Sequence, residues 1–355
     1  MNGMLQPLII EPKITSAIWG GDALVRDYGK KGDANATLGE SLECWDENVV
    51  RTGPFAGKSI AELRVELGKR LMGSLDAGHI FPVLTKIIDA RQSLSVQVHP
   101  NDAYAQRVER QQNGKTECWV ILSAQPGAEL VLGWAKPTNR AEYERRVADG
   151  SLGEILRRVP VKPNDAFYLP AGTLHAIGAG IQLFETQQAS DLTYRIFDWN
   201  RVGPDGKPRQ LHVDRAADVL DYGRGETAQT MHLPYQTDGI ASEACIADPR
   251  FVVEKARVAS VAGALLPDGE PVIFMAMESG MTLEVDGVAT VVGPWTTALI
   301  PAEIARVDVV ASRDASALVV TTDRNVFLRR LARADVPAAD RDAFLAQFEA
   351  SSTPA

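Results

Sequence analysis

The sequence contains only three cysteines, Cys44, Cys118 and Cys245, and no two of them are close together. Disulfide frameworks need an even, clustered set of cysteines, and thiolate zinc sites need closely spaced pairs. The sequence therefore indicates neither kind of protein. We interpret the three cysteines as reduced packing residues and expect a cytoplasmic protein.

Long apolar runs and an excess of positive charge are also absent. No stretch approaches the ~18 apolar residues of a membrane span, and residues 1–13 have neither the basic region nor the apolar core of a signal peptide. The formal net charge of -9 at pH 7 argues against binding to nucleic acid or to an anionic membrane surface. We therefore expect no nucleic-acid partner and no membrane partner. An anionic substrate would need local lysines and arginines to bind it.

Apolar residues are plentiful, and their spacing is mostly that of strands. The 355 residues are 45% hydrophobic and 23% charged, which is ordinary for a soluble protein of roughly two or three domains. Short apolar and β-branched runs fill residues 7–50 and 80–99, and alternating runs return at 251–322. This pattern predicts a mainly β protein with two β-sandwiches, the second one smaller. We interpret the polar residues 226–239 between them as a linker.

Helical patterns are confined to a few segments. Residues 59–71 begin with a capping box formed by Ser59 and Glu62 and continue with an apolar stripe. Residues 137–158 are charged and predict a small helical insert that covers the sheet. Residues 335–355 predict one amphipathic helix, which contains Phe344, Leu345 and Phe348 and frays at its end.

The segment SLSVQVHPND contains the first candidate ligands. Gln97 and His99 alternate with Val96 and Val98, which is the period of a strand with one polar and one buried face. An amide oxygen and an imidazole then point the same way, as metal ligands on a sheet do. A single histidine on a strand is more often structural, so this interpretation depends on later segments.

The segment GKTECWVIL supplies the next polar pair. A glycine turn opens a strand on which Lys115 and Glu117 share one face, while Val120 and Leu122 share the other. The two charges could form a surface ion pair, worth ~0–1 kcal/mol. Beside a metal ion, Glu117 would instead be an oxygen ligand and Lys115 a positioned cation or acid.

The stretch from residue 164 to 201 is the richest in polar motifs. In PAGTLHAIG, a turn leads into a strand whose first polar residue is His175. The strands through Glu185 and Arg195 flank QQASD, which is typical of a turn. If this turn centres on Ser190, Glu185 and Arg195 stand opposite each other on one face. A structural ion pair is the alternative, but we favour a functional pair because the same predicted sheet carries His175.

Four candidate ligands thus come from three strands of one predicted sandwich: Gln97, His99, Glu117 and His175. Two imidazoles with two oxygens suit Zn²⁺, although Mn²⁺, Fe²⁺ or Co²⁺ would also fit. No thiolate takes part, which argues against a closed structural zinc site. Open positions on the ion imply contact with a substrate. The last histidine is His232, so a histidine metal site in the second sandwich is excluded.

Three earlier residues are open to two interpretations each. Trp19 is more typical of a core tryptophan than of a site residue. Glu40 is by default a surface carboxylate. Lys86 lies in an otherwise apolar run, where a lysine is costly unless it has a function or extends to the surface.

Taken in order, the motifs QVHPND, GKTE-x-W, PAGTLHAIGAGI and ETQQASDLTYRIFDWNR resemble the type I mannose-6-phosphate isomerases (phosphomannose isomerases), which are zinc-dependent cupins. The resemblance spans residues 7–215 and implies cupin-type (jelly-roll) sandwiches. No long helical domain is present, so the chain resembles the short bacterial form. The metal ligands that the resemblance implies are Gln97, His99, Glu117 and His175. It further implies Trp19, Glu40 and Lys86 for substrate binding, and Lys115, Glu185 and Arg195 for catalysis.

The resemblance also implies an activity, the interconversion of mannose 6-phosphate and fructose 6-phosphate through a cis-enediol. It implies one zinc ion per chain, a small hexose phosphate as partner, and a monomer or weak homo-oligomer. We expect a catalytic cupin domain over residues 1–240, a smaller metal-free cupin-like domain over 241–325 and a helical tail over 326–355. Two other functions stay open: a cupin enzyme of different chemistry, such as another sugar isomerase or a dioxygenase, and a non-catalytic sugar-phosphate-binding cupin.

Overall fold

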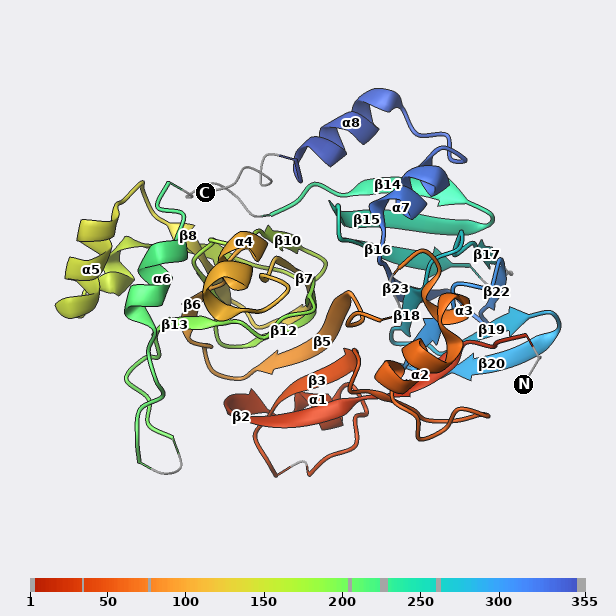
Figure 1. Cartoon of the computed structure of the whole chain (residues 1–355), viewed down its shortest axis with the longest axis horizontal. Helices are drawn as coiled ribbons and strands as arrows, with labels where there is room; N and C mark the ends of the chain where they lie inside the picture. Colours follow the sequence, from red (N-terminus) through yellow and green to blue (C-terminus); the bar gives the residue numbers. More distant parts are fainter. Residues whose placement is uncertain are drawn as a thin grey trace.

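In the computed structural model, the chain forms four antiparallel β-sheets that stack as two sandwiches, with helices at their margins (Figure 1). The structure describes residues 4–33, 35–75, 78–203, 206–223, 229–259 and 263–349. The prediction of a mainly β fold is confirmed. Within these ranges, no helix is long and apolar enough to cross a bilayer.

The first sandwich consists of a six-stranded sheet in the order β10-β7-β12-β5-β3-β2 and a five-stranded sheet in the order β13-β6-β11-β8-β9. The strands of the six-stranded sheet are β2 (Lys13–Gly21), β3 (Leu38–Cys44), β5 (Val83–Ala90), β7 (Glu117–Ala124), β10 (Ala166–Leu169) and β12 (Ile181–Gln188). Those of the five-stranded sheet are β6 (Val96–Val98), β8 (Glu129–Trp134), β9 (Leu156–Pro160), β11 (His175–Ala176) and β13 (Tyr194–Phe197). Strands that follow one another in sequence therefore often lie in different sheets.

The second sandwich pairs an eight-stranded sheet, β14-β15-β16-β23-β18-β21-β1-β4, with a four-stranded sheet, β17-β22-β19-β20. The strands of the larger sheet are β1 (Leu8–Glu11), β4 (Val49–Val50), β14 (Leu233–Thr237), β15 (Ile240–Asp248), β16 (Phe251–Val258), β18 (Val272–Ala276), β21 (Thr297–Ile300) and β23 (Ala315–Thr321). Those of the smaller sheet are β17 (Gly263–Leu265), β19 (Met281–Val285), β20 (Val288–Val292) and β22 (Val307–Val310).

The helices are short and lie around the two sandwiches. They are α1 (Ala23–Arg26), α2 (Ile60–Leu67), α3 (Lys69–Met72), α4 (Asp102–Tyr104), α5 (Arg140–Ala148), α6 (Val213–Val219), α7 (Arg324–Leu331) and α8 (Ala338–Ala346). A π-helical turn (Ala105–Glu109) follows α4, and a 3₁₀ turn (Leu152–Ile155) follows α5. In Figure 1, α5 and α6 flank the first sandwich, whereas α7 and α8 lie near β14 and β15. The insert predicted over residues 137–158 is thus helical in α5 and the 3₁₀ turn, but residues 156–158 belong to strand β9, which pairs with β8.

Alternation along the strands of the six-stranded sheet gives it two buried faces. Trp119 and Leu183 belong to the layer inside the first sandwich. Their neighbours Val120 and Phe184 point the other way, into a large core shared with the eight-stranded sheet. The second sandwich has an apolar interior of its own. The six-stranded sheet is therefore held from both sides, and polar residues on its inner face are largely withdrawn from solvent.

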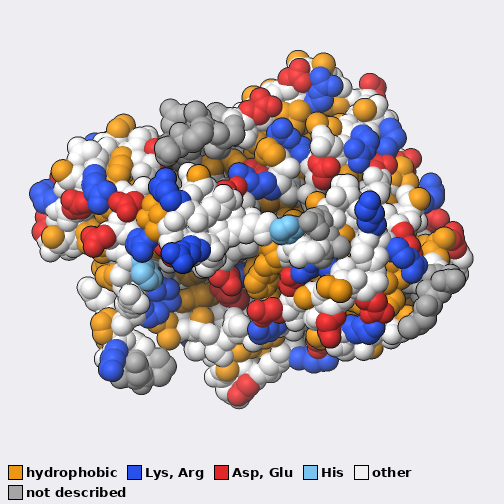
Figure 2. Space-filling view, in the orientation of Figure 1, with side chains coloured by type: hydrophobic (Ala, Val, Ile, Leu, Met, Phe, Trp, Pro, Cys, Tyr) orange, Lys and Arg blue, Asp and Glu red, His pale blue; other side chains and the backbone are white. Residues whose placement is uncertain are grey.

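Two predictions from composition can be compared with the structure. All three cysteines are free and buried, as predicted. On the face drawn in Figure 2, lysines and arginines are interspersed with aspartates and glutamates. Local groups of cations, rather than the overall charge, therefore decide where an anion could bind.

The predicted helix over residues 59–71 is present but divided. The capping box forms as predicted, because the Ser59 side chain accepts from the Glu62 N–H and the Glu62 carboxylate accepts from the Ser59 N–H. Gly68 ends α2 with a φ of 52°, in the left-handed region that favours glycine. A second short helix, α3, begins directly after it.

The linker prediction is corrected, whereas the helix predicted in the tail is present. Residues 233–237 form strand β14 instead of a linker, because Leu233 and Tyr235 alternate with exposed residues and pair in register with β15. Residues 335–349 contain one helix, α8, as predicted, with Pro337 as its N-cap, and α7 precedes this segment. Residues 350–355, for which fraying was predicted, lie outside the described residues.

Strand pairing also bears on how the chain is divided. β1 pairs with β21, with Leu8 opposite Leu299, although β1 precedes the first sandwich in sequence. β4 extends the same sheet beyond β1. We keep a boundary near residue 240 as a proposal, with β1, β4 and β14 counted with the second sandwich.

Candidate active site

The polar residues of SLSVQVHPND lie on the inner face of the five-stranded sheet. Val96 and Val98 belong to the outer core that also includes residues of α5 and α6. Gln97 between them therefore points inward. In the strand register, Gln97 lies opposite His175 on β11 and opposite Arg195 on β13. The predicted alternation is confirmed, and three polar side chains are neighbours on one face.

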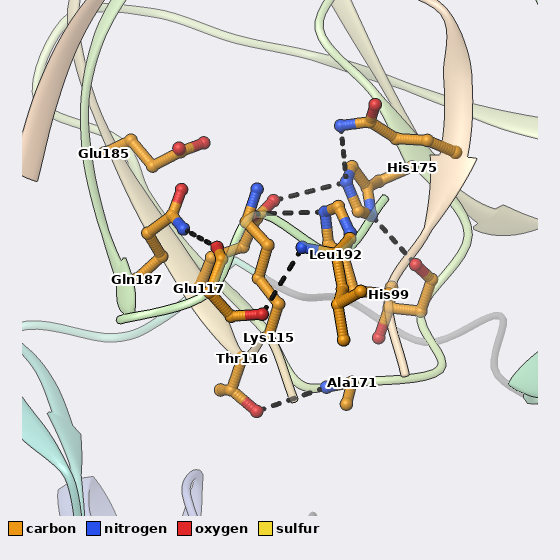
Figure 3. A network of polar contacts seen from close by, with 12 residues as sticks. His99, Lys115, Thr116, Glu117, Ala171, His175, Glu185, Gln187 and Leu192 are labelled. Carbon is orange, nitrogen blue, oxygen red and sulfur yellow. Dashed lines mark hydrogen bonds and ion pairs between the residues drawn. The ribbon is translucent and has the colours of Figure 1, made fainter. Parts of the chain in front are cut away.

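Glu117 approaches the same point from the opposite sheet. It is the first residue of β7 and is fully buried. Ligand atoms of His99, Glu117 and His175 all lie within 4.8 Å of one another. His99 Nε2 is 3.4 Å from Glu117 Oε2, and His175 Nε2 is 3.2 Å from Glu117 Oε1 (Figure 3). The sandwich thus brings together three of the four residues predicted as ligands.

Backbone carbonyls determine which nitrogen of each imidazole faces Glu117. Nδ1 of His99 is 2.8 Å from the Leu192 carbonyl oxygen, and Nδ1 of His175 is 2.8 Å from that of Thr173. A carbonyl oxygen can only accept, so each Nδ1 carries the proton and each Nε2 keeps a lone pair. Two lone pairs then face a buried carboxylate, an arrangement that a bound cation would stabilise. These residues fit a divalent metal ion.

The electrostatics of the cluster favour the forms that bind metals. Burial, followed by the Lys115 ammonium, lowers the pKa of His99 to about 3, and burial also lowers the pKa of His175. Burial opposes ionisation of Glu117. Lys115 Nζ, 3.0 Å from Glu117 Oε2, nevertheless holds the pKa of this carboxyl well below its ordinary value. At neutral pH the cluster offers two neutral imidazoles and a carboxylate.

Gln97 is the fourth predicted ligand. Its amide nitrogen lies 3.3 Å from His175 Nε2. A metal ion would take the amide oxygen, which reaches the same place when the terminal amide turns by half a rotation. The ligand role of Gln97 stays a prediction.

A second polar group lies beside the ligand cluster on the inner face of the six-stranded sheet. Lys86 Nζ on β5 is 3.3 Å from Glu40 Oε2 on β3 and 3.9 Å from Glu185 Oε1 on β12. Glu185 is directly opposite Lys86 in the strand register. Lys86 is therefore neither a core residue without a partner nor a lysine that extends to the surface, because two carboxylates face it inside the sandwich.

Burial and neighbouring charges shift the proton affinities of this group. Burial, followed by repulsion from Glu117, raises the pKa of Glu185 to about 7, against the attraction of Lys115 and Lys86. Burial disfavours the charged form of Lys86, but Glu40 and Glu185 outweigh it and raise the pKa of the ammonium group. Near neutral pH, Glu185 can exchange a proton while Lys86 stays charged.

The predicted cross-strand pair of Glu185 and Arg195 is wrong. Glu185 lies on β12 of the six-stranded sheet, whereas Arg195 lies on β13 of the five-stranded sheet. The segment after Gln188 carries the chain across the sandwich instead of back along the same sheet, so the two residues belong to facing layers. The Arg195 Nε–H donates to the Ser95 hydroxyl oxygen at 3.2 Å.

Arg195 lies at a cationic end of the site. Burial, followed by Arg209, lowers the pKa of Arg195, and Arg201 acts in the same direction. Asp198 Oδ1 is 2.5 Å from Arg201 Nη2 and 2.6 Å from Arg209 Nη2, so one carboxylate serves both of these neighbours. Three guanidinium groups with one carboxylate leave a net positive charge here.

Trp19 lies on β2 and is buried in the inner layer of the first sandwich. Its ring is so close to Gly39 that a Cβ there would lie 2.7 Å from a ring carbon. This contact explains why a glycine directly precedes Glu40. The burial agrees with a core tryptophan, and a contact with substrate stays a prediction.

Sequence reasoning missed two residues of the site. Ser95 continues the alternation of Gln97 and His99 toward the start of the strand, so the pattern that identified those two could have found it. Trp119 donates its indole N–H to Glu185 Oε2 at 2.8 Å. Its only signal in the sequence was the tryptophan of GKTE-x-W, which a buried strand explains equally well.

Comparisons with known proteins agree on one family. The family model described as "Phosphomannose isomerase type I, catalytic domain" matches residues 8–123. "Mannose-6-phosphate isomerase ManA" of Bacillus subtilis (strain 168) is 43% identical over 234 residues, which cover 64% of this chain and 72% of that protein. The mannose-6-phosphate isomerase of Streptococcus mutans is 39% identical over 256 residues, covering 71% of this chain and 79% of that protein.

Solved structures share the fold over most of the chain. The crystal structure of the mannose 6-phosphate isomerase from Bacillus subtilis has a TM-score of 0.82 at 28% identity, covering 89% of this chain and 99% of that one. A phosphomannose isomerase mutant from Salmonella typhimurium has a TM-score of 0.71 at 17% identity, covering 90% and 100%, and shows the fold alone. Because a relative 43% identical is matched over 72% of its own length, this chain belongs to the type I phosphomannose isomerase family.

Proposed function

We propose that this protein is an aldose–ketose isomerase that interconverts mannose 6-phosphate and fructose 6-phosphate. The relatives described above carry that activity in their names. The observation that carries the proposal is the position of the His99–Glu117–His175 cluster beside Glu185 and Lys86, inside one sandwich. A carbon-bound proton can be moved there by a carboxyl group while cations hold the charge that develops on oxygen.

Zinc is the metal that we propose, with Mn²⁺, Fe²⁺ or Co²⁺ as possible substitutes. The proposed ligands are Gln97, His99, Glu117 and His175. Two imidazoles and two oxygens without a thiolate are the kind of donor set found at catalytic rather than structural zinc sites. When bound, the ion would supply Lewis-acid polarisation of the substrate's oxygens. The carbonyls of Leu192 and Thr173 would keep the imidazoles in the ligand orientation.

We assign the transfer of the carbon-bound proton to the carboxyl group of Glu185. In the open-chain aldose, C2 loses its proton and the C1 carbonyl oxygen gains one, which gives a cis-enediol. Return of a proton to C1 and loss of the O2 proton then give the ketose. Burial of Glu185, followed by repulsion from Glu117, raises its pKa to about 7 in the metal-free protein. A carboxyl with a raised pKa can accept and return a proton near neutral pH. Lys86 and Lys115 would stabilise negative charge on the reacting oxygens.

We assign the phosphate of the substrate to the cationic end of the site. Arg195 there has Arg201 and Arg209 as neighbours, and Asp198 is the carboxylate that pairs with both of these. Guanidinium groups bind phosphate oxygens with two parallel N–H donors. This assignment leaves Lys86 and Glu40 for the sugar hydroxyls, in agreement with the substrate-binding role expected for them.

We further propose that the enzyme works in the cytoplasm as a monomer or weak homo-oligomer. Three buried free cysteines suit a reducing compartment. A small hexose phosphate would be its partner.

A coupled assay of mannose 6-phosphate turnover tests the proposal. Purified protein is measured as prepared, after chelation, and after zinc is added back. We expect activity that chelation removes and zinc restores. Full activity after exhaustive chelation would overturn the metal assignment, and no turnover by zinc-loaded, folded protein would overturn the reaction.

The two rival functions predict different results, which two additional measurements distinguish. A cupin dioxygenase would consume O₂ with iron and leave hexose phosphates unchanged. A non-catalytic binding protein would bind mannose 6-phosphate in calorimetry without turnover. Retention of the ligand cluster together with Lys115, Glu185 and Arg195 favours the enzyme over the binding protein.

A further inference from the structure

Trp119 has no role in the proposed chemistry, although it lies at the centre of the site. It is fully buried on the inner face of β7, two residues after Glu117. In the strand register it is directly opposite Glu185 on β12. The tryptophan in GKTE-x-W therefore lies next to both the ligand cluster and the carboxyl group to which we assign proton transfer.

The indole ring of Trp119 makes two specific contacts. Its Nε1–H donates to Glu185 Oε2 at 2.8 Å. Its edge meets the ring of His175, with the centroids 5.4 Å apart and the planes at 78°. One rigid side chain thus joins Glu185, on the six-stranded sheet, to His175, on the facing sheet.

The hydrogen bond makes the two oxygens of Glu185 inequivalent. Oε2 is held by the indole, whereas Oε1 is the oxygen nearer to Lys86, at 3.9 Å. A carboxylate held by one oxygen cannot rotate freely, so the other oxygen keeps a fixed direction. Trp119 has no acidic or basic group near neutral pH and cannot transfer the proton itself.

We propose that Trp119 is a positioning residue that holds Glu185 by Oε2, so that Oε1 is the oxygen that exchanges the carbon-bound proton. The inference rests on the proposed isomerase function. It assigns to this tryptophan a role that burial alone would not require, since a phenylalanine would fill most of the same space without the N–H.

Loss of the indole hydrogen bond sets the direction of the expected pH effect, against a background of charged groups around Glu185. In the metal-free protein, Lys86 on β5 and Lys115 before β7 favour its ionised form, whereas Glu117 on β7 and Glu40 on β3 oppose it. The indole N–H adds a donor to the ionised form. Its removal should therefore make Glu185 harder to ionise and move the acidic limb of the rate profile to higher pH.

Trp119→Phe in the zinc-loaded full-length enzyme is the test, with Trp134→Phe as the matched control. Trp134 is also fully buried, in the outer core beside α5 and α6, and its indole donates to the Asp221 carbonyl oxygen, outside the ligand cluster. We expect Trp119→Phe to lower kcat by about 10- to 100-fold, with little change in KM or zinc content. We also expect the acidic limb of kcat to move up by about one pH unit. The control should keep the wild-type limb.

Replacement of Trp119 by β-(3-benzothienyl)alanine, which keeps the ring shape but lacks the N–H, gives a second variant if phenylalanine prevents folding. A kcat and acidic limb like those of wild type in either folded variant would overturn the inference. Failure of the proposed function is distinguishable, because the wild-type protein would then show no turnover of mannose 6-phosphate.

Discussion

Replacement of Glu185 by glutamine should stabilise the metal-free protein at alkaline pH. Glu185 is 3% exposed, and burial followed by repulsion from Glu117 raises its pKa from an ordinary 4.5 to about 7. The unfolded chain ionises this carboxyl freely above pH 4.5, whereas the folded protein does so only above about pH 7. The folded state therefore binds this proton more tightly than the unfolded chain does. The stability that this binding contributes is fully present below pH 4.5 and is lost as the pH rises through 7.

The size of the effect follows from the two pKa values. At about 1.4 kcal/mol per pH unit, a rise from 4.5 to about 7 corresponds to roughly 3 kcal/mol of unfolding free energy above pH 8. Glutamine has nearly the same shape and no charge, and its amide oxygen can still accept from the Trp119 indole. Glu185→Gln should gain roughly 3 kcal/mol at pH 8.5 and less than about 1 kcal/mol at pH 5.

Urea unfolding of the chelator-treated proteins at pH 5, 7 and 8.5 measures this difference. Glu47→Gln is the matched control, because Glu47 is half-exposed and pairs with Lys13 on the surface. That control should stay within about 0.5 kcal/mol of wild type at every pH. A gain for Glu185→Gln that does not grow with pH, or a loss at pH 8.5, would refute the reasoning, since the cost of burying a charge grows only as the group ionises.

Three further changes test other parts of the structure. Arg195→Ala should lower turnover by about 100-fold or more while zinc content is unchanged, measured by kinetics and metal analysis. Arg257→Ala, at an exposed arginine, is its control. Retained activity in Arg195→Ala would contradict the role of Arg195. Phe348→Ala should lower the unfolding free energy by about 3–5 kcal/mol in thermal melts, because Phe348 is buried and meets the ring of Tyr168 edge-on at 5.3 Å; a negligible change would mean that this contact does not anchor α8. Ser59→Ala should lower the unfolding free energy by about 1 kcal/mol, because the capping box of α2 is lost. An unchanged urea midpoint would contradict this contribution of the cap.

The ligand cluster could be predicted because the direction of each ligand follows from its nearest neighbours in sequence. Strand alternation places Gln97 inward between two apolar valines, and it puts Lys115 on the face of Glu117. Successive side chains of a strand point to opposite faces in every arrangement of the strands. The residues that share a face can therefore be predicted before the strand pairing is known. The capping box of α2 was predictable for the same reason, since it involves residues three positions apart.

The pairing of Glu185 with Arg195 could not be predicted in this way. Two strands joined by a short turn usually pair, and the sequence contains nothing that marks a crossing to the facing sheet. In the structure, β12 pairs with β5 and β7 along its length. Those partners leave no edge free for β13, which joins β6 instead. Which sheet β13 joins is decided by competition with strands that are distant in sequence. A local sequence pattern contains no information about that competition.

The same limit explains the linker and the first strand. The polarity of residues 226–239 predicts a linker, yet Leu233 and Tyr235 alternate with exposed residues and form β14 beside β15. β1 likewise has its partner, β21, nearly 300 residues away in sequence. Short strands of this kind gain their stability from partners, so propensity alone predicts them poorly.

The two-sided burial of the six-stranded sheet explains how one strand can carry both core and site. Along β12, Phe184 faces the core shared with the second sandwich, while Glu185 faces the interior of the first. Backbone pairing with β5 and β7 and apolar packing on the outer face stabilise β12. They offset the free energy that the buried charge on its inner face costs. A protein with only one sandwich would have to support the same charge with a sheet packed on a single side. The gain expected for Glu185→Gln therefore measures what the buried charge of Glu185 costs the folded protein.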